Sequence, residues 1–165
     1  LAKLAQEDLD PKEADRYMQV LTFSTNLEHV GDIIEKSLMD IARKKVKCDE
    51  RFSNDGWDEI KNFHAAVLAN MRLSQVIFLS QDSVLARQLI DSKKDILKSE
   101  QLTSTYHFER LGQGQPETLA TSSLHLDIIR DYRRINSYVT TVAYPILENA
   151  SKQKKVTKVQ VGNKF

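Results

Sequence analysis

The sequence is poor in the residues that form cross-links and tight turns. Its 165 residues include one cysteine, Cys48, together with five glycines and three prolines. A single cysteine excludes an internal disulfide, so packing alone must stabilise the fold. Few glycines and prolines disfavour all-β folds, which need many tight turns, and favour long uninterrupted helices.

Long hydrophobic runs and an excess of one charge are also missing. The longest apolar run, residues 65–69, is far shorter than the roughly 20 residues that span a bilayer, so we expect no transmembrane helix in these residues. The formal net charge is +1, which gives no general attraction to nucleic acid, and we expect no nucleic-acid partner. The length and the 41% hydrophobic content suit one globular domain with a real core.

Four stretches carry apolar residues at helical spacing. The first helix is predicted over residues 11–46, with Asp10 as N-cap and Pro11 at the first position. Its apolar stripe consists of Val20, Phe23, Leu27, Val30, Ile34, Leu38 and Ile41. Further helices are predicted over about 57–80, 84–111 and 117–146, with a kink or fraying at Pro145. The fold class is therefore an all-α antiparallel bundle over residues 1–150, followed by a basic and solvated tail over 151–165.

The predicted first helix carries a group of acidic residues away from its apolar stripe. Glu28 and Asp32 are offset by about 40° around the helix, and Glu35 falls in the same sector. Like charges at this spacing repel unless a cation or a basic side chain lies nearby. Oxygen ligands suit Mg²⁺, Ca²⁺, Mn²⁺ or iron, so the pattern indicates a metal site; a solvated charged face is the alternative. Gly31 is interpreted as a close-packing position beside these acids.

A motif similar to the acid pair occurs further along the chain. "LEHVGD" at 27–32 is followed 99 residues later by "LDIIRD" at 126–131, which aligns Glu28 with Asp127 and Asp32 with Asp131. Such a repeat indicates an internal duplication with an acid pair on each long helix. His107 and His125 are further candidate ligands, but joint coordination is not expected, because His125 and Asp127 are two residues apart and point to different sides of a helix.

These motifs resemble a known family. "LEHVGDII" is similar to the L-E-R-I-G-D segment of the PhoU family, whose members have two tandem three-helix units related by pseudo-twofold symmetry. The resemblance implies a truncated first unit here, and metal ions bound on the outer face by Glu28 and Asp32 and by Asp127 and Asp131. The later order of "FHAAVLANMRLSQVIF", "QLIDSKKDIL" and "LHLDIIRDYRRINSYV" resembles the PhoU-like domain that follows the membrane part of bacterial sodium/phosphate cotransporter-family proteins.

A second alignment of the later motif is open. "RDYRRINSYV" can also be laid on the family segment "RDLERIADHA", and this places Arg133 and Ser137 at the motif positions. In that alignment the second copy has no metal site. His29 also stands where the family usually has arginine.

The resemblance implies a regulatory domain without catalysis or turnover of a small molecule. It would lie at the cytoplasmic face of the inner membrane, as part of a sodium/phosphate cotransporter-type protein, and couple phosphate or metal status to transport. The partners expected are the membrane-transport domain of the same chain and a second copy; Arg130, Arg133 and Arg134 are candidates to contact phosphate or a partner. The alternatives are a free-standing PhoU-type regulator and a structural bundle without metal. A carboxylate-bridged di-metal enzyme would need Glu-x-x-His pairs, which the sequence lacks.

Overall fold

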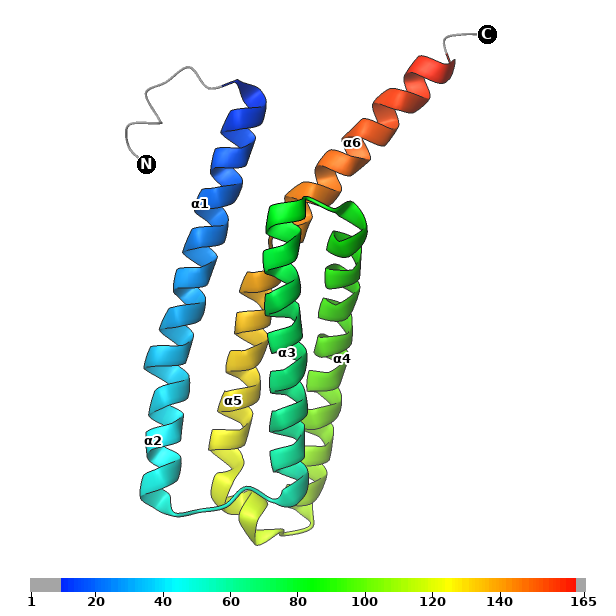
Figure 1. The fold of residues 1–165 in the computed structure, drawn as a ribbon. Helices are drawn as coiled ribbons and strands as arrows, with labels where there is room; N and C mark the ends of the chain where they lie inside the picture. The colour runs from blue at the N-terminus through cyan, green and yellow to red at the C-terminus, as the bar shows by residue number, and fades with distance from the viewer. Residues whose placement is uncertain (1–9, 163–165) are drawn as a thin grey trace.

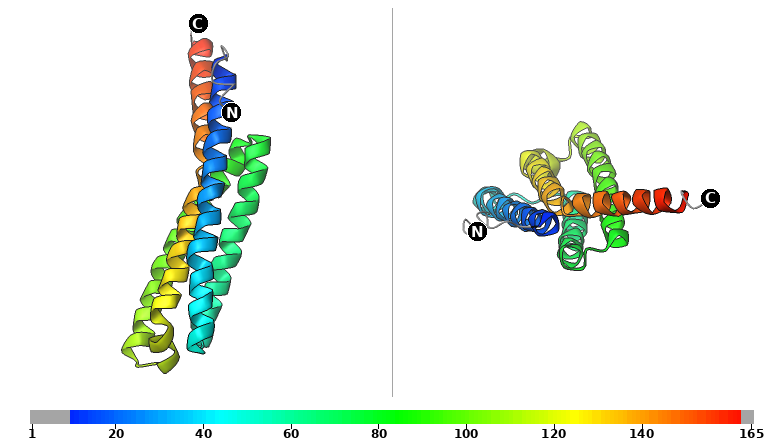
Figure 2. Two further views of the ribbon diagram at one scale, coloured as in Figure 1. Left: turned by 90° about the vertical axis from the view of Figure 1, so that its left-hand side faces the viewer. Right: turned by 90° about the horizontal axis from the view of Figure 1, so that it is seen from above.

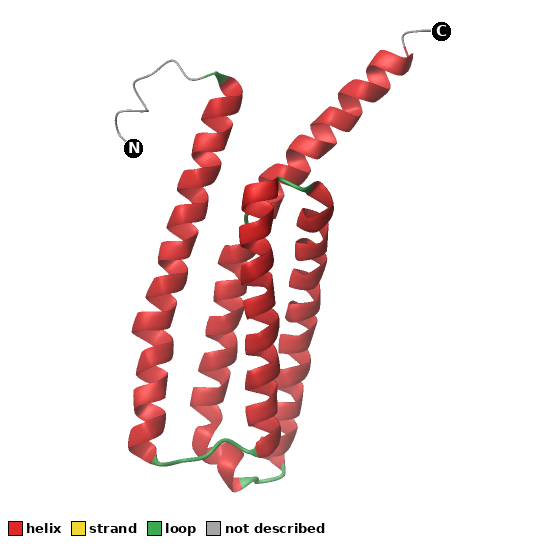
Figure 3. Cartoon of the chain, in the orientation of Figure 1, coloured by secondary structure: helices red, strands yellow, loops and turns green. Residues whose placement is uncertain are grey.

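The computed structural model describes residues 10–162, with side chains to residue 152, and within that range it contains helices and no strand (Figures 1 and 3). The predicted all-α antiparallel bundle is confirmed. The elements are α1 (Pro11–Asp32), a π-helical segment η2 (Ile33–Leu38), α2 (Met39–Cys48), α3 (Asn54–Ser80), α4 (Ser83–Gly112), α5 (Pro116–Thr140) and α6 (Ala143–Gly162). None of these described helices is long and apolar enough to cross a membrane.

The helices form a compact group with one long rod beside it. The segments α1, η2 and α2 follow one another without a break and form a single rod, residues 11–48, that lies along α5 (Figure 1). Helices α3, α4 and α5 pack against one another, and α6 crosses the end of α3 and α4 (Figure 2). The basic residues from 151 onward begin inside α6, and residues 163–165 lie outside the described range.

Side-chain caps define where the helices begin. Asp10 accepts hydrogen bonds from the backbone N–H groups of Lys12 and Glu13, and the Glu13 side chain accepts from the Asp10 N–H, so the predicted cap is confirmed. Ser53 caps α3 by accepting from the Gly56 N–H, and Asp82 caps α4 in the same way. Such caps satisfy backbone donors that would otherwise have no partner in the first turn of a helix.

The hydrophobic core has two parts. The larger part lies between the rod and helices α3, α4 and α5. Its buried members are Val30, Ile33, Ile60, Phe63, Val67, Ile96, Ile129, Ile135 and Val139. The smaller part lies under the start of α6 and contains Ile77, Ala86, Leu89, Ala143 and Ile146.

The buried stripe of the rod differs from the predicted one. The prediction placed Ile34 in the core, but Ile34 is 44% exposed, whereas Ile33 is 5% exposed. The stripe steps from Ile33 to Leu38, five residues on, because η2 has the i→i+5 hydrogen bonding of a π-helix. The prediction was wrong here because helical spacing assumes 3.6 residues per turn throughout.

The interruption predicted at Pro145 lies slightly earlier. Helix α5 ends at Thr140 and α6 begins at Ala143, so the break is at residues 141–142. A proline ring within a helix clashes with the carbonyl of the residue four positions earlier, which is Thr141. The Thr141 carbonyl instead accepts a hydrogen bond from the Tyr144 N–H at 3.2 Å, and Pro145 lies in the first turn of α6, where proline is tolerated.

The core packing yields a direct test of stability. Leu89 is fully buried in the smaller core, whereas Leu79 is 78% exposed. We expect Leu89→Ala to lower the free energy of unfolding by about 2–5 kcal/mol, because it removes buried methyl groups and leaves a cavity. Leu79→Ala should change it by less than about 0.5 kcal/mol. Urea unfolding followed by circular dichroism measures both; equal losses in the two variants would contradict this description of the core.

Candidate functional site

The three acids of the first motif lie on a solvent-facing side of the rod. Glu28 and Glu35 are exposed and the Asp32 side chain is half-exposed, while Val30 and Ile33 between them are buried against the bundle. Lys36 pairs with Asp32 at 2.9 Å. The hydrogen bond to Asp32 and the negative charges of Asp32, Glu35 and Glu28 raise the pKa of the Lys36 ammonium. Lys36 is thus the basic side chain that moderates this acidic face, and its i,i+4 spacing from Asp32 was the signal for it.

The acids of the second motif differ in burial, although the Arg130 guanidinium contacts both, at 2.7 Å from Asp127 and 3.5 Å from Asp131. The Asp127 side chain is 41% exposed and pairs with Arg130 at 2.7 Å. Asp131 is fully buried, and it accepts hydrogen bonds from the Ser37 hydroxyl and from Arg134 Nη1 at 3.1 Å. The structure therefore does not bring Asp127 and Asp131 to one open face. Asp131 instead joins α5 to the rod.

Polar contacts between the rod and α5 bear on the two alignments of the repeat. Asn26 Nδ2 donates to Thr141 Oγ1 at 2.7 Å near one end, and Ser37 donates to Asp131 near the other. A twofold relation that exchanges the two contacts pairs Asn26 with Asp131, 105 residues later, and Ser37 with Thr141, 104 residues later. The two offsets, 105 and 104, differ by one residue, and the π turn of η2 between Asn26 and Ser37 accounts for this difference because it contains one extra residue.

The 105-residue offset corresponds to the second alignment. It places Arg133 opposite Glu28 in the repeat and Ser137 opposite Asp32. The 99-residue offset would make His125 the counterpart of Asn26, but His125 contacts Glu59 of α3 and not the rod. The geometry favours the alignment with one acid pair, on the rod.

The three arginines predicted as anion or partner contacts all form ion pairs within the domain. Arg130 pairs with Asp127, Arg134 pairs with Asp131, and Arg133 Nε lies 3.1 Å from Glu100 Oε1 of α4. Each arginine side chain is about half-exposed, so all three still present hydrogen-bond donors to solvent.

The donor set for a metal is small. Among the residues with described side chains, no three His, Cys, Asp or Glu residues lie close enough to hold one ion. Glu28 and Asp32 supply oxygen ligands from adjacent turns, and these suit a hard divalent cation. They fit an open site that water or another molecule would complete, and they do not fit a closed cage.

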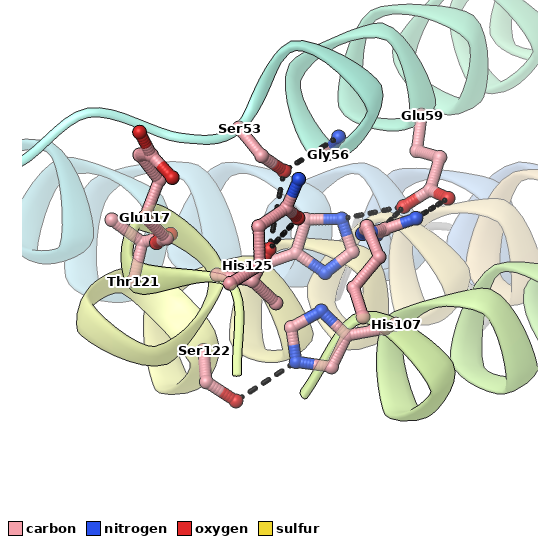
Figure 4. A network of polar contacts seen from close by, with 11 residues as sticks. Ser53, Gly56, Glu59, His107, Glu117, Thr121, Ser122 and His125 are labelled. Carbon is pink, nitrogen blue, oxygen red and sulfur yellow. Dashed lines mark hydrogen bonds and ion pairs between the residues drawn. The ribbon is translucent and has the colours of Figure 1, made fainter. Parts of the chain in front are cut away.

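A buried polar network lies at the end of the bundle where α3 begins, α4 ends and α5 begins (Figure 4). Glu59 of α3 accepts two hydrogen bonds from Arg110 of α4, at 2.8 and 2.7 Å. Nε2 of His125 on α5 lies 3.1 Å from Glu59 Oε2. One carboxylate thus connects three helices through side chains that are almost entirely buried.

The two histidines of this network are stacked. The rings of His107 and His125 are parallel, with centroids 4.7 Å apart, and His107 Nε2 is 2.8 Å from Ser122 Oγ (Figure 4). Gly56 packs closely beside this pair, because a Cβ there would lie only 3.0 Å from Ser53 Oγ and in van der Waals contact with His125 Cδ2 at 3.5 Å. The space enclosed by these side chains is too small for a water molecule, so the network connects helices and offers no room for a substrate.

Burial and charge set the ionisation of the network. Burial lowers the pKa of His107, and the neighbouring His125 and Arg110 lower it further. Burial opposes ionisation of Glu59, but the contacts with His125 and Arg110 outweigh it and hold the pKa of Glu59 below its ordinary value. The hydrogen bonds to Glu59 raise the pKa of Arg110.

Sequence reasoning missed this network because it joins residues 51 and 66 positions apart. The available signal was weak: polar residues at helical spacing on faces that turned out to be buried, such as Thr103, His107 and Arg110. Gly31, in contrast, is not a close-packing position, because a Cβ there would have nothing within 4 Å.

Removal of the shared carboxylate should be costly. We expect Glu59→Gln to lower the free energy of unfolding by about 3 kcal/mol, because it leaves the Arg110 charge almost buried and without a counter-ion. Asp58→Asn is the matched control, since the Asp58–Lys61 pair at 2.7 Å is exposed and should contribute less than about 1 kcal/mol. Urea unfolding of both variants at pH 7.5 is the measurement. If both variants lose a similarly small amount of unfolding free energy, the network does not stabilise the contact between the three helices.

The network also predicts a dependence of stability on pH. Because the pKa of His107 is lower in the folded state than in the unfolded chain, unfolding takes up a proton near pH 6.5. The free energy of unfolding should therefore decrease as the pH falls from 7.5 to 5.5. In His107→Gln this decrease should be smaller, and an unchanged pH slope would contradict the assignment.

Comparison with known proteins agrees with this architecture. Residues 60–146, from α3 to the beginning of α6, match the PhoU domain family. The chain is 35% identical over 148 residues to YjbB of Escherichia coli K12 and of Shigella flexneri, and 34% identical to that of Salmonella typhimurium. The name of these relatives describes a proposed inorganic phosphate export protein, and each match covers 90% of this chain but 27% of the relative. No solved structure is significantly similar. The chain belongs to the PhoU domain family, as its motifs predicted.

Proposed function

We propose that this domain regulates phosphate transport within a longer membrane protein and does not itself catalyse a reaction. The observation that carries the proposal is the match of 148 residues to relatives named for phosphate export, of which the matched part is only 27%. A domain that forms a quarter of such a protein is suited to control the remainder. The partner is the membrane-transport part of the same protein, and the site of action is the cytoplasmic face of the membrane.

The proposed regulatory surface is the acidic face of the rod. Glu28 and Asp32, with Glu35 beside them, bind a divalent cation such as Mn²⁺ or Mg²⁺, or an iron ion, in an open site. The rod also packs on α5 through Val30, Ile33 and Ser37. A ligand bound to the outer face of the rod therefore acts on the same helix that packs on α5.

Two further predictions remain open under this proposal. A second metal site at Asp127 and Asp131 would require a metal ion to displace Arg130 from both carboxylates, and Ser37 and Arg134 from Asp131. Arg130, Arg133 and Arg134 lie along one half-exposed part of α5 and would bind phosphate or an acidic surface of the partner.

Metal binding can be tested on the isolated domain. We expect Mn²⁺ titration, followed by calorimetry or by paramagnetic line broadening, to give an affinity at least about 10-fold lower in the double variant Glu28→Gln, Asp32→Asn. Asp40→Asn is the matched control, because Asp40 forms the same i,i+4 pair on the same rod, with Lys44 at 2.8 Å. If the parent binds no more Mn²⁺ than the double variant, the metal proposal is wrong, whereas the regulatory proposal is not affected.

The regulatory role needs the complete protein. We expect Asp32→Asn in the full-length protein to change the rate of phosphate flux across the membrane, while the amount of protein in the membrane stays the same. Asp40→Asn should leave the flux unchanged. Flux can be followed with labelled phosphate in cells or vesicles. Unaltered flux after removal of residues 10–152 from a correctly inserted protein would refute a regulatory role of this domain.

A further inference from the structure

The π-helical segment separates two halves of the rod that are in different helical registers. In α1, Val30 and Ile33 are buried against the bundle; after η2, Leu38 packs on the core and Ile41 is buried. The Met39 N–H bonds to the Ile34 carbonyl, five residues earlier. This wider turn takes up one extra residue, and only for that reason can Ile33 and Leu38 occupy the same side of the rod.

The rod carries a second apolar stripe directly beside the buried one. It consists of Val20, Leu27, Gly31 and Ile34. Gly31 directly follows the buried Val30, and Ile34 directly follows the buried Ile33. Val20 and Ile34 are exposed, and Leu27 is only partly buried. In an unbroken α-helix, Ile34 would share one side with Leu38 and Ile41. The rod could therefore bury either Ile33, with a π turn, or Ile34, as an unbroken α-helix.

We propose that the rod is a two-state element with a π register, described above, and an α register in which η2 becomes α-helical. In the α register, α1 is turned about its own axis by about 100°, the rotation of one residue. Each residue of α1 then takes the place of the one before it. Ile34 replaces Ile33 in the core, and Leu27 replaces Asn26 opposite Thr141.

Opposing contributions separate the two registers. The π register buries Val30, stacks Phe23 on Phe78 and forms the Asn26–Thr141 hydrogen bond, but it contains the less favourable π turn. The α register restores regular hydrogen bonding and covers Leu27, but it places Gly31 where Val30 now lies. Gly31 weakens the α register because it brings no side chain to that position, and Ser24 weakens it because it replaces Phe23 on Phe78.

The register determines which way the acidic face points. Glu28 and Asp32 belong to α1, before η2, so they turn with it by about 100° relative to α5. Any ligand or partner that contacts these acids in one orientation favours one register. This inference concerns the helix itself and holds whether or not the acids bind a metal.

Disulfide trapping distinguishes the registers. In a Cys48→Ser background, the pair Asn26→Cys, Thr141→Cys reports the π register, since these side chains are in contact. The pair Leu27→Cys, Thr141→Cys reports the α register. Under mild oxidation in the isolated domain we expect both cross-links, the second forming about 10- to 1,000-fold more slowly, because it captures a minor state.

Two further variants provide the controls. Deletion of Ile34 removes the extra residue of the π turn, so that Ile33 and Leu38 share one side in a regular helix, and the 27–141 cross-link should be lost. Gly31→Val should accelerate the 27–141 cross-link, because it fills the core position in the α register and meets nothing within 4 Å of its Cβ in the π register. Circular dichroism and urea unfolding establish that each variant is folded. A 27–141 rate that is equal in the parent, the deletion and Gly31→Val would overturn the proposal.

Discussion

The packing of the rod on α5 is the contact on which the arrangement of the domain depends. Its centre is a fully buried carboxylate, Asp131, that the rod reaches through the Ser37 hydroxyl. A buried carboxyl group tolerates few positions of its partners, because each lost hydrogen bond leaves a buried polar atom without a partner. The Ser37 contact therefore fixes how α2 and η2 lie on α5. With η2 in its π register, Glu28 and Glu35 are exposed and Asp32 is half-exposed on the outer side of the rod.

The two ends of the domain are built differently. At the end where α3 begins, Glu59 holds three helices together through nearly buried partners, and no water fits between them. At the opposite end, α1 and α6 leave a hollow of about 330 Å³ between them, lined by residues such as Phe23 and Pro145. The close polar contacts are thus at the end held by Glu59, and the open space is at the end formed by α1 and α6. Under the proposed function, a ligand on the rod acts away from the Glu59 network.

The sequence was sufficient for the bundle, most helix boundaries, the Asp10 cap and the outward position of Glu28 and Asp32, because these depend on local spacing. The π segment could not be predicted, since Ile33 and Ile34 are both apolar and either one completes a stripe. The burial of Asp131 could not be predicted either. An aspartate on a charged helix is normally at the surface, and its partner Ser37 is 94 positions away in the sequence. The Glu59 network joins residues that only the tertiary fold brings together.

The contact between Asn26 and Thr141 spans 115 positions of the chain, whereas the contacts of Glu59 within the three-helix unit span 51 and 66. Within this domain the rod is synthesised before α5, the helix on which it packs. The rod can dock only after α5 has been made, and its contacts, which have the larger sequence separation, close more slowly. Until then both apolar stripes of the rod are open to solvent, so this segment is the part of the nascent domain in greatest need of protection from aggregation.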